Sequence, residues 1–187
     1  MGIAKGAVAA PKFVEGPLYQ EVMGRQPVAV IGHVRAATKG SAHINKNNHP
    51  IVFGQIVGVH NGVIRNDEYL TKHYAVKRNA VVDSEVVFAL LDKLDRLDRP
   101  SIERVLALLD GYYALVFQNV KEPGKVWLVK GPGRPLVVGY DTRLHTAWFA
   151  SEEEFITRAY RRGHVSREGL QMGEMMEGEL LLHCKFI

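Results

Sequence analysis

Apolar and polar positions along the chain follow two periods, one typical of helices and one typical of strands. The clearest helical stretch runs from Asp83 to Leu94, because its apolar residues fall on one face. Asp83 stands where a helix N-cap belongs. Residues 101–109 repeat the pattern after Pro100, and residues 67–73 predict a shorter helix.

Short apolar runs bounded by turn residues predict strands over most of the remaining chain. These runs are residues 28–31, 51–59 with 63–64, 112–119, 125–130, 136–140, 146–150, 170–172 and 179–186. Asn61-Gly62 interrupts one of them and predicts a tight turn with positive φ. Ser151 and Glu154 form a capping box for a last helix through Tyr160. The order of elements predicts an α+β layered fold, with antiparallel sheets covered by helices.

Composition narrows the class of protein. The chain has 187 residues and one cysteine, Cys184, which excludes an intrachain disulfide framework or a cysteine-rich metal site. It gives no sign of an oxidising compartment. No apolar run approaches the roughly 20 residues that span a bilayer, and the start lacks a signal-peptide pattern. We therefore expect a single domain over residues 1–187, located in the cytoplasm.

The formal charge of +4 is modest, and the basic residues gather in one stretch, Arg158, Arg161, Arg162, His164 and Arg167. Such a run is more often a solvated face than a nucleic-acid site, and no nucleic-acid-binding motif accompanies it. A polyanion-binding protein remains an alternative, with nucleic acid an unlikely partner.

Three motifs carry possible chemistry, and each also has a structural interpretation. Arg35 follows an apolar run, where its guanidinium suits a ligand carboxylate or a protein acid. Asn61 and the Gly62 N–H have the donors of an oxyanion hole, or form a hairpin turn. Asp83 is an anchor for a ligand ammonium, or a helix cap.

Two other features predict no site. The spacings of His33, His43, His49 and His60 match no preformed ligand pair, so we expect no metal. The segment 131–135, Gly-Pro-Gly-Arg-Pro, lacks the ending of a phosphate loop and predicts a turn between strands.

Taken in order, the motifs resemble class II (type 2) glutamine amidotransferases, whose amidotransferase domain belongs to the N-terminal-nucleophile hydrolases. The resemblance rests on residues 32–40 (Gly-His-x-Arg-x-Ala-Thr-x-Gly), 47–50 (Asn-x-His-Pro), 60–62 (His-Asn-Gly) and 83–85 (Asp-Ser-Glu), and continues more weakly to Ser151. It implies a four-layer α/β/β/α sandwich of two antiparallel sheets, here missing its first strand.

The resemblance also implies roles for residues in a glutamine site that needs no cofactor. Arg35 would hold the α-carboxylate of glutamine and Asp83 its α-ammonium, while Thr38 and His60 would line the pocket. Asn61 and Gly62 would form the oxyanion hole. A zwitterionic ligand needs both charges, and attack on an amide needs oxyanion donors.

The family's nucleophile is a cysteine at the mature N-terminus, and this chain offers none there. Met1 is a thioether that cannot form a thioester, and Gly2-Ile3-Ala4 matches a later strand of the family better than its opening. Cys184 lies in an alternating apolar segment and is expected to pack as a small apolar residue. Ala36 replaces an aromatic residue of many relatives, which changes the expected pocket shape.

We therefore expect a nucleophile-less, non-catalytic binding or structural protein, similar to compact phage-type members of the family, and then in host cytoplasm or virion. A protein partner or self-association would cover the surface of the missing strand. The alternative is an active amidotransferase, hydrolysing glutamine to glutamate and ammonia, whose cysteine segment is absent from this chain. Retention of all the pocket motifs favours that alternative.

Overall fold

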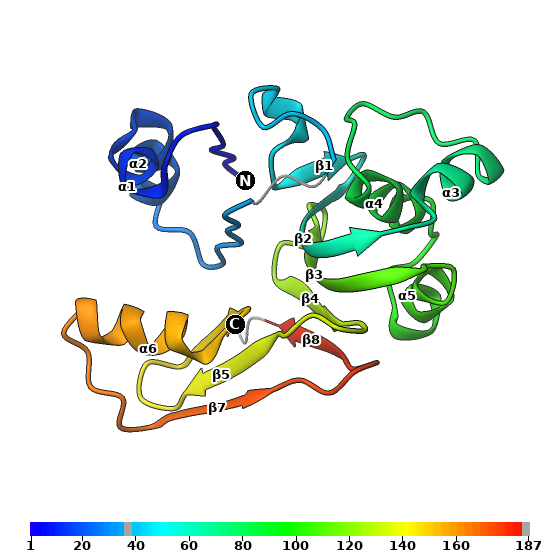
Figure 1. The fold of residues 1–187 in the computed structure, drawn as a ribbon. Coiled ribbons are helices and arrows are strands. Elements are labelled where there is room, and N and C mark those ends of the chain that lie inside the picture. The colour runs from blue at the N-terminus through cyan, green and yellow to red at the C-terminus, as the bar shows by residue number, and fades with distance from the viewer. Residues whose placement is uncertain (36–38, 185–187) are drawn as a thin grey trace.

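Two antiparallel sheets form the centre of the structure, a computed structural model that describes residues 1–35 and 39–184 (Figure 1). One sheet has the strand order β1-β2-β3-β4-β8 and the other the order β6-β5-β7. The strands of the first are β1 (Ile51–Phe53), β2 (Ile56–Ile64), β3 (Gly111–Asn119), β4 (Lys125–Lys130) and β8 (Leu180–Cys184). Those of the second are β5 (Val137–Asp141), β6 (Thr146–Ala150) and β7 (Leu170–Glu174).

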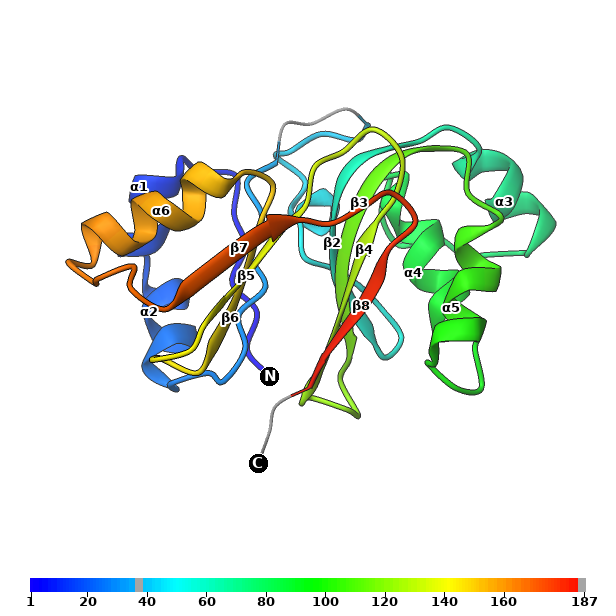
Figure 2. The ribbon, with the colours of Figure 1, turned by 90° about the horizontal axis from the view of Figure 1, so that it is seen from below.

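Helices cover the outer faces of both sheets, which gives the expected four layers (Figure 2). The five-stranded sheet is covered by α3 (Asp67–His73), α4 (Ser84–Asp92) and α5 (Arg99–Leu106), and the three-stranded sheet by α6 (Glu153–Arg162). Two further short helices, α1 (Ala10–Glu15) and α2 (Pro17–Gly24), precede a single 3-10 turn at Asn45–Asn47. The prediction of an α+β sandwich of two antiparallel sheets is confirmed.

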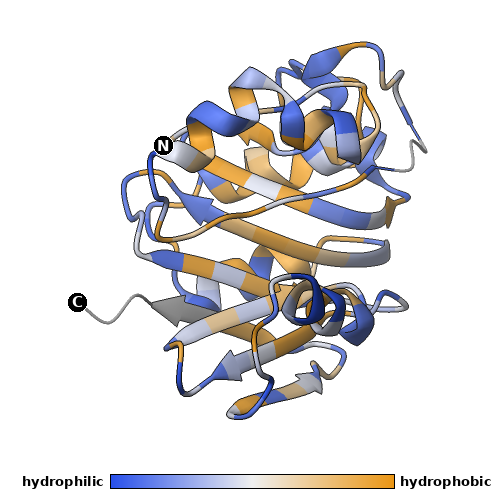
Figure 3. Ribbon diagram, turned by 90° about the vertical axis from the view of Figure 1, so that its left-hand side faces the viewer, coloured by the Kyte–Doolittle hydropathy of each residue, from blue (hydrophilic) through white to orange (hydrophobic). Residues whose placement is uncertain are grey.

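Strand alternation divides the core into three parts, one between each pair of layers. In β3, Leu115 and Phe117 face the α4 cluster, whereas Ala114 and Val116 face the other sheet. The third part lies under α6, around Ile156. Apolar residues are accordingly concentrated along the strands of the sheets (Figure 3).

Several elements match the sequence pattern residue for residue, among them α3, β4 and β6. The prediction of a turn at Asn61-Gly62 is wrong, because both residues lie inside β2 and pair with β3. The chain reverses instead at Gly54-Gln55, where Gly54 has φ +53° and the Gln55 N–H donates to Asp92. Gly62 has a positive φ of 143°, and its backbone lies close to the carbonyl group of Tyr112.

The predicted strand at residues 28–31 is also wrong. A strand needs a ladder partner, and no described strand pairs with this segment. Val28 and Val30 are 70% and 52% exposed. The preceding helices α1 and α2 pack on each other, and neither carries a buried residue.

Two predicted helix caps and one predicted helix start differ from the structure. Asp83 makes no cap bond, and α6 begins after Glu152 without the expected Ser151–Glu154 box. Helix α5 is capped by Asp98, whose carboxylate accepts from the Ser101 N–H at 3.0 Å, so it begins before Pro100 rather than after it. Proline in the first helical turn lacks only a donor that would be unpaired there.

Candidate functional site

A small polar cavity of about 220 Å³ lies between the end of β2, the start of α4 and the segments around residues 33–35 and 131–135. It brings together most of the residues singled out by the sequence motifs, namely Arg35, His60, Asn61, Gly62 and Asp83. Its other lining residues are His33, Val34, His49, Val82, Ser84 and Arg134. Thr38 and Ala36 lie outside the described residues.

Asp83 links the cavity to the backbone of β2. Its Oδ2 accepts a hydrogen bond from the buried Ile64 N–H at 2.7 Å and lies 3.9 Å from Nδ1 of His60. The residue is only 6% exposed. This bond takes the place of the predicted helix cap, and it fixes the carboxylate beside the cavity.

The loop before α4 is held by a second buried carboxylate. Glu85 accepts hydrogen bonds from the backbone N–H groups of Asn79 and Ala80 at 2.9–3.1 Å. Arg78 reaches from the same loop to Asp67 of α3 at 3.0 Å. These contacts determine where the chain enters α4, and therefore where Asp83 lies.

The backbone N–H of Gly62 lies on the edge of β2 that faces away from β3. Bonded and non-bonded pairs alternate along an antiparallel ladder, and the Arg65 N–H donates to the Asp110 carbonyl just beyond its end. Bonded pairs therefore fall on odd-numbered residues of β2. The N–H groups of Gly62 and Ile64 point the other way, and that of Ile64 meets Asp83. An oxyanion role for Gly62 and Asn61 stays a prediction, consistent with this direction.

Arg35 is held by backbone carbonyls rather than by a protein acid. Its Nη2 donates to the carbonyl oxygens of Lys39 and Gly40. Its Nη1 is buried and has no hydrogen-bond partner among the described residues. One edge of the guanidinium thus carries a donor that no described residue accepts.

Three histidines converge at the cavity although their spacing in the sequence does not indicate it. The rings of His33 and His49 lie 4.5 Å apart, and Nε2 of His49 is 3.2 Å from the Ser84 hydroxyl. Burial lowers the pKa of His33 to about 4 and that of His49 to about 2. Burial also lowers the pKa of His60, against the opposing charge of Asp83. All three rings are therefore neutral at pH 7.

The described residues contain no group of three histidine, cysteine or acidic side chains arranged to hold a metal. In the same part of the chain, no helix is long and apolar enough to cross a membrane.

Arg134 is one of the cavity residues that sequence reasoning missed. It comes from the turn at 131–135, which lies between β4 and β5 as predicted. Its Nε is buried without a hydrogen-bond partner among the described residues. The only sequence signal was an arginine between two prolines, which restrict the backbone around it.

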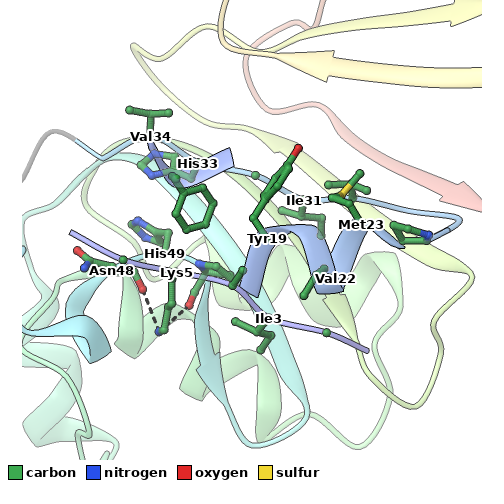
Figure 4. Close-up of a pocket in the computed structure, with 18 of the residues that line it drawn as sticks. Ile3, Lys5, Tyr19, Val22, Met23, Ile31, His33, Val34, Asn48 and His49 are labelled. Carbon is green, nitrogen blue, oxygen red and sulfur yellow. Dashed lines mark hydrogen bonds between the residues drawn. The ribbon is translucent and has the colours of Figure 1, made fainter. Parts of the chain in front are cut away.

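A larger cavity of about 780 Å³ adjoins the small one and shares His33, Val34, Arg35 and His49 with it (Figure 4). Its walls come chiefly from residues 1–10, from α1 and α2 and from residues 27–35. The Lys5 ammonium donates to the carbonyl oxygens of Asn48 and Pro50, each at 3.1 Å, and burial lowers the pKa of Lys5.

The single cysteine lies far from the cavity residues of β2. Cys184 ends β8, at the edge of the sheet, where its backbone pairs with Lys125 of β4. Strands β3 and β4 separate β8 from β2. At about 4.8 Å per strand, the backbones of β8 and β2 are about 14 Å apart. Ser84 is closer, but its side chain is completely buried.

Comparison with known proteins gives a consistent family. A family model described as a glutamine amidotransferase domain matches residues 33–158. The 7-cyano-7-deazaguanine synthase of Saccharolobus solfataricus is 32% identical over 57% of this chain and 23% of its own length. The isomerizing glutamine–fructose-6-phosphate aminotransferase of Geobacillus kaustophilus is 27% identical over 95% of this chain and 28% of its own.

Among solved structures, the glutamine phosphoribosylpyrophosphate amidotransferase of B. subtilis superposes with a TM-score of 0.60. It is 24% identical and covers 80% of this chain and 31% of its own, so it shows a shared fold. The chain spans less than a third of the length of each of these three proteins.

Proposed function

The chain belongs to the glutamine amidotransferase domain family, and we propose that its small cavity binds glutamine and that these 187 residues act as a binding protein rather than as a hydrolase. The observation that carries the proposal is the convergence of Arg35 and Asp83 on one cavity of amino-acid size. A guanidinium and a carboxylate are the two charges that an α-amino acid needs.

The proposed pose of glutamine follows from the positions of the Arg35 guanidinium and the Asp83 carboxylate. The α-carboxylate accepts from Nη1 of Arg35, and the α-ammonium donates to Asp83. The side-chain amide then extends toward Asn61 and the Gly62 N–H. Neutral histidines add no positive charge that would compete with the ammonium.

The non-catalytic part of the proposal rests on where the two candidate nucleophiles, Cys184 and Ser84, lie. Cys184 is the only cysteine of the sequence, and its strand is three positions from β2 in the sheet. Ser84 contacts His49, as a nucleophile contacts its base, and it lines the cavity, but its solvent-exposed fraction is 0%. Binding is therefore the function that these residues support best, with the cytoplasm as the proposed location.

Calorimetric titration with glutamine tests the binding. We expect saturable heat with the unchanged protein and at least about tenfold weaker binding with Asp83→Asn, because a charge-assisted bond is lost. This variant keeps an oxygen that can accept from the Ile64 N–H, so the fold should persist. Asp95→Asn removes an exposed carboxylate outside the cavity and serves as the control. No heat with the unchanged protein at millimolar glutamine would overturn the proposal.

An enzymatic assay of glutamate release tests the second part separately. We expect no release above a protein-free blank. Release that depends on this protein would replace the binding function by the alternative, an active amidotransferase.

Two other expectations have their own tests. The basic stretch includes Arg158, which pairs with Glu154 at 2.6 Å, so part of its charge is already neutralised. A salt-sensitive gel shift of DNA or RNA by this protein would restore polyanion binding as a function.

Self-association or a protein partner over the helices α1 and α2 is measured by light scattering during size-exclusion chromatography.

A further inference from the structure

The small cavity contains a second arginine that a neutral glutamine side chain does not require. Arg134 does not belong to the sequence motifs and lies in the turn between β4 and β5. It nevertheless lines the same cavity as Arg35 and Asp83. No hydrogen bond or ion pair joins its side chain to any residue that the structure describes, and its buried Nε is unpaired. A buried donor without an acceptor costs free energy that a bound anion would recover.

The charges of the cavity do not balance for glutamine. Its charged lining residues are Arg35, Arg134 and Asp83, and the three histidines are neutral at pH 7. The lining therefore carries one net positive charge. Glutamine is a zwitterion with no net charge, whereas glutamate has one ammonium and two carboxylates, which match one carboxylate and two guanidiniums.

The positions of these charges agree with this count. Arg35 and Asp83 serve the α-carboxylate and α-ammonium in the proposed pose, so Arg134 is left for the far end of the ligand. Arg134 lines the same cavity as Asn61 and Gly62, where the proposed pose puts the side-chain end of the ligand. A side-chain carboxylate near Asn61 would accept charge-assisted hydrogen bonds from Arg134, which are roughly twice as strong as those to a neutral amide oxygen.

We propose that this cavity selects an acidic amino acid, glutamate, over glutamine, and that Arg134 is the residue that makes the selection. The inference rests on the proposed binding of an α-amino acid by Arg35 and Asp83. It changes the ligand from the family's amide to the corresponding acid.

Paired calorimetric titrations at pH 7.5 with glutamate and with glutamine test the inference. In the unchanged protein we expect glutamate to bind about tenfold or more tightly than glutamine. In Arg134→Gln the ratio of the two dissociation constants should fall to about one, through weaker glutamate binding. Arg161→Gln removes an exposed arginine of α6 and should leave the ratio unchanged.

The outcomes separate this inference from the proposed function. Glutamine binding as tightly as glutamate in the unchanged protein overturns the selectivity but leaves amino-acid binding intact. A ratio that persists in Arg134→Gln overturns the role of Arg134. Binding of neither amino acid overturns both proposals. If Arg134→Gln does not fold, Arg134→Lys tests the same point, because it keeps the charge but loses the bidentate geometry, and a partial fall in the ratio is expected.

Discussion

Acidification from pH 7.5 to 5.5 should destabilise this protein through the histidines of the small cavity. In the folded state the pKa of His33 is about 4 and that of His49 about 2, because burial disfavours the charged ring. In the unfolded chain both return to about 6.5. The unfolded state therefore binds more protons below pH 6.5, and stability falls as the pH drops toward the folded pKa values.

The magnitude depends on the unfolded pKa alone, because pH 5.5 is still above both folded values. One pH unit below 6.5 costs about 1.3 kcal/mol for each histidine, so His33 and His49 together cost about 2.6 kcal/mol. Both rings keep some solvent exposure, so this figure is an upper bound. The lowered pKa of His60 acts in the same direction. Carboxylates change their charge little in this range.

Urea denaturation at the two pH values measures the effect. Equal slopes with urea at both pH values would show that only stability changed. His33→Gln should lose about half of the pH dependence, whereas His73→Gln, at an exposed position on α3, should keep it all. Equal stability of the unchanged protein at pH 7.5 and 5.5, or full pH dependence in His33→Gln, would refute the reasoning.

Three further substitutions test the framework around the cavity. Gly62→Ala should cost at least about 2 kcal/mol, because a Cβ there would lie 1.9 Å from the Tyr112 carbonyl oxygen and the φ of 143° is strained for other residues; an unchanged urea midpoint would contradict this. Glu85→Gln should cost about 1–3 kcal/mol by weakening the buried acceptor of two backbone N–H groups, and thermal melting should show a lower Tm. Phe88→Ala should cost about 3–5 kcal/mol, because the ring is completely buried under β2; a loss below 1 kcal/mol in urea would mean that the core is not packed as described.

Elements with a strong local pattern were predictable from the sequence. The strand at 125–130 and the helix at 67–73 have the predicted bounds, because alternation and helical spacing reflect burial directly. The run at 28–31 was not predictable, since a strand depends on a distant partner as much as on its own residues. Asn61-Gly62 was misinterpreted for the same reason, because pairing with β3 keeps the dipeptide extended.

The site was predictable where its residues belong to ordered motifs. Arg35, Asn61 and Asp83 line one cavity, whereas the roles that the resemblance implied for them stay predictions. The hydrogen bond from Ile64 to Asp83 was missed, because a residue before a helix is normally interpreted as a cap. His49 and Arg134 were missed as cavity residues because their approach depends on the packing of separate segments, which sequence spacing does not encode.

Asp83 and Gly62 both line the cavity and both stabilise the fold, and this has a consequence for how the sequence can diverge. Asp83 holds the backbone of β2 through Ile64, and Gly62 passes Tyr112 where no side chain fits. A lineage that abandoned the cavity would still keep Gly62 and a hydrogen-bond acceptor at position 83, because selection on stability alone would remove other substitutions. Arg134 has no such tie to the described residues and would be free to drift. Its retention among natural variants would record selection for a ligand, whereas retention of the motifs would record only selection for the fold.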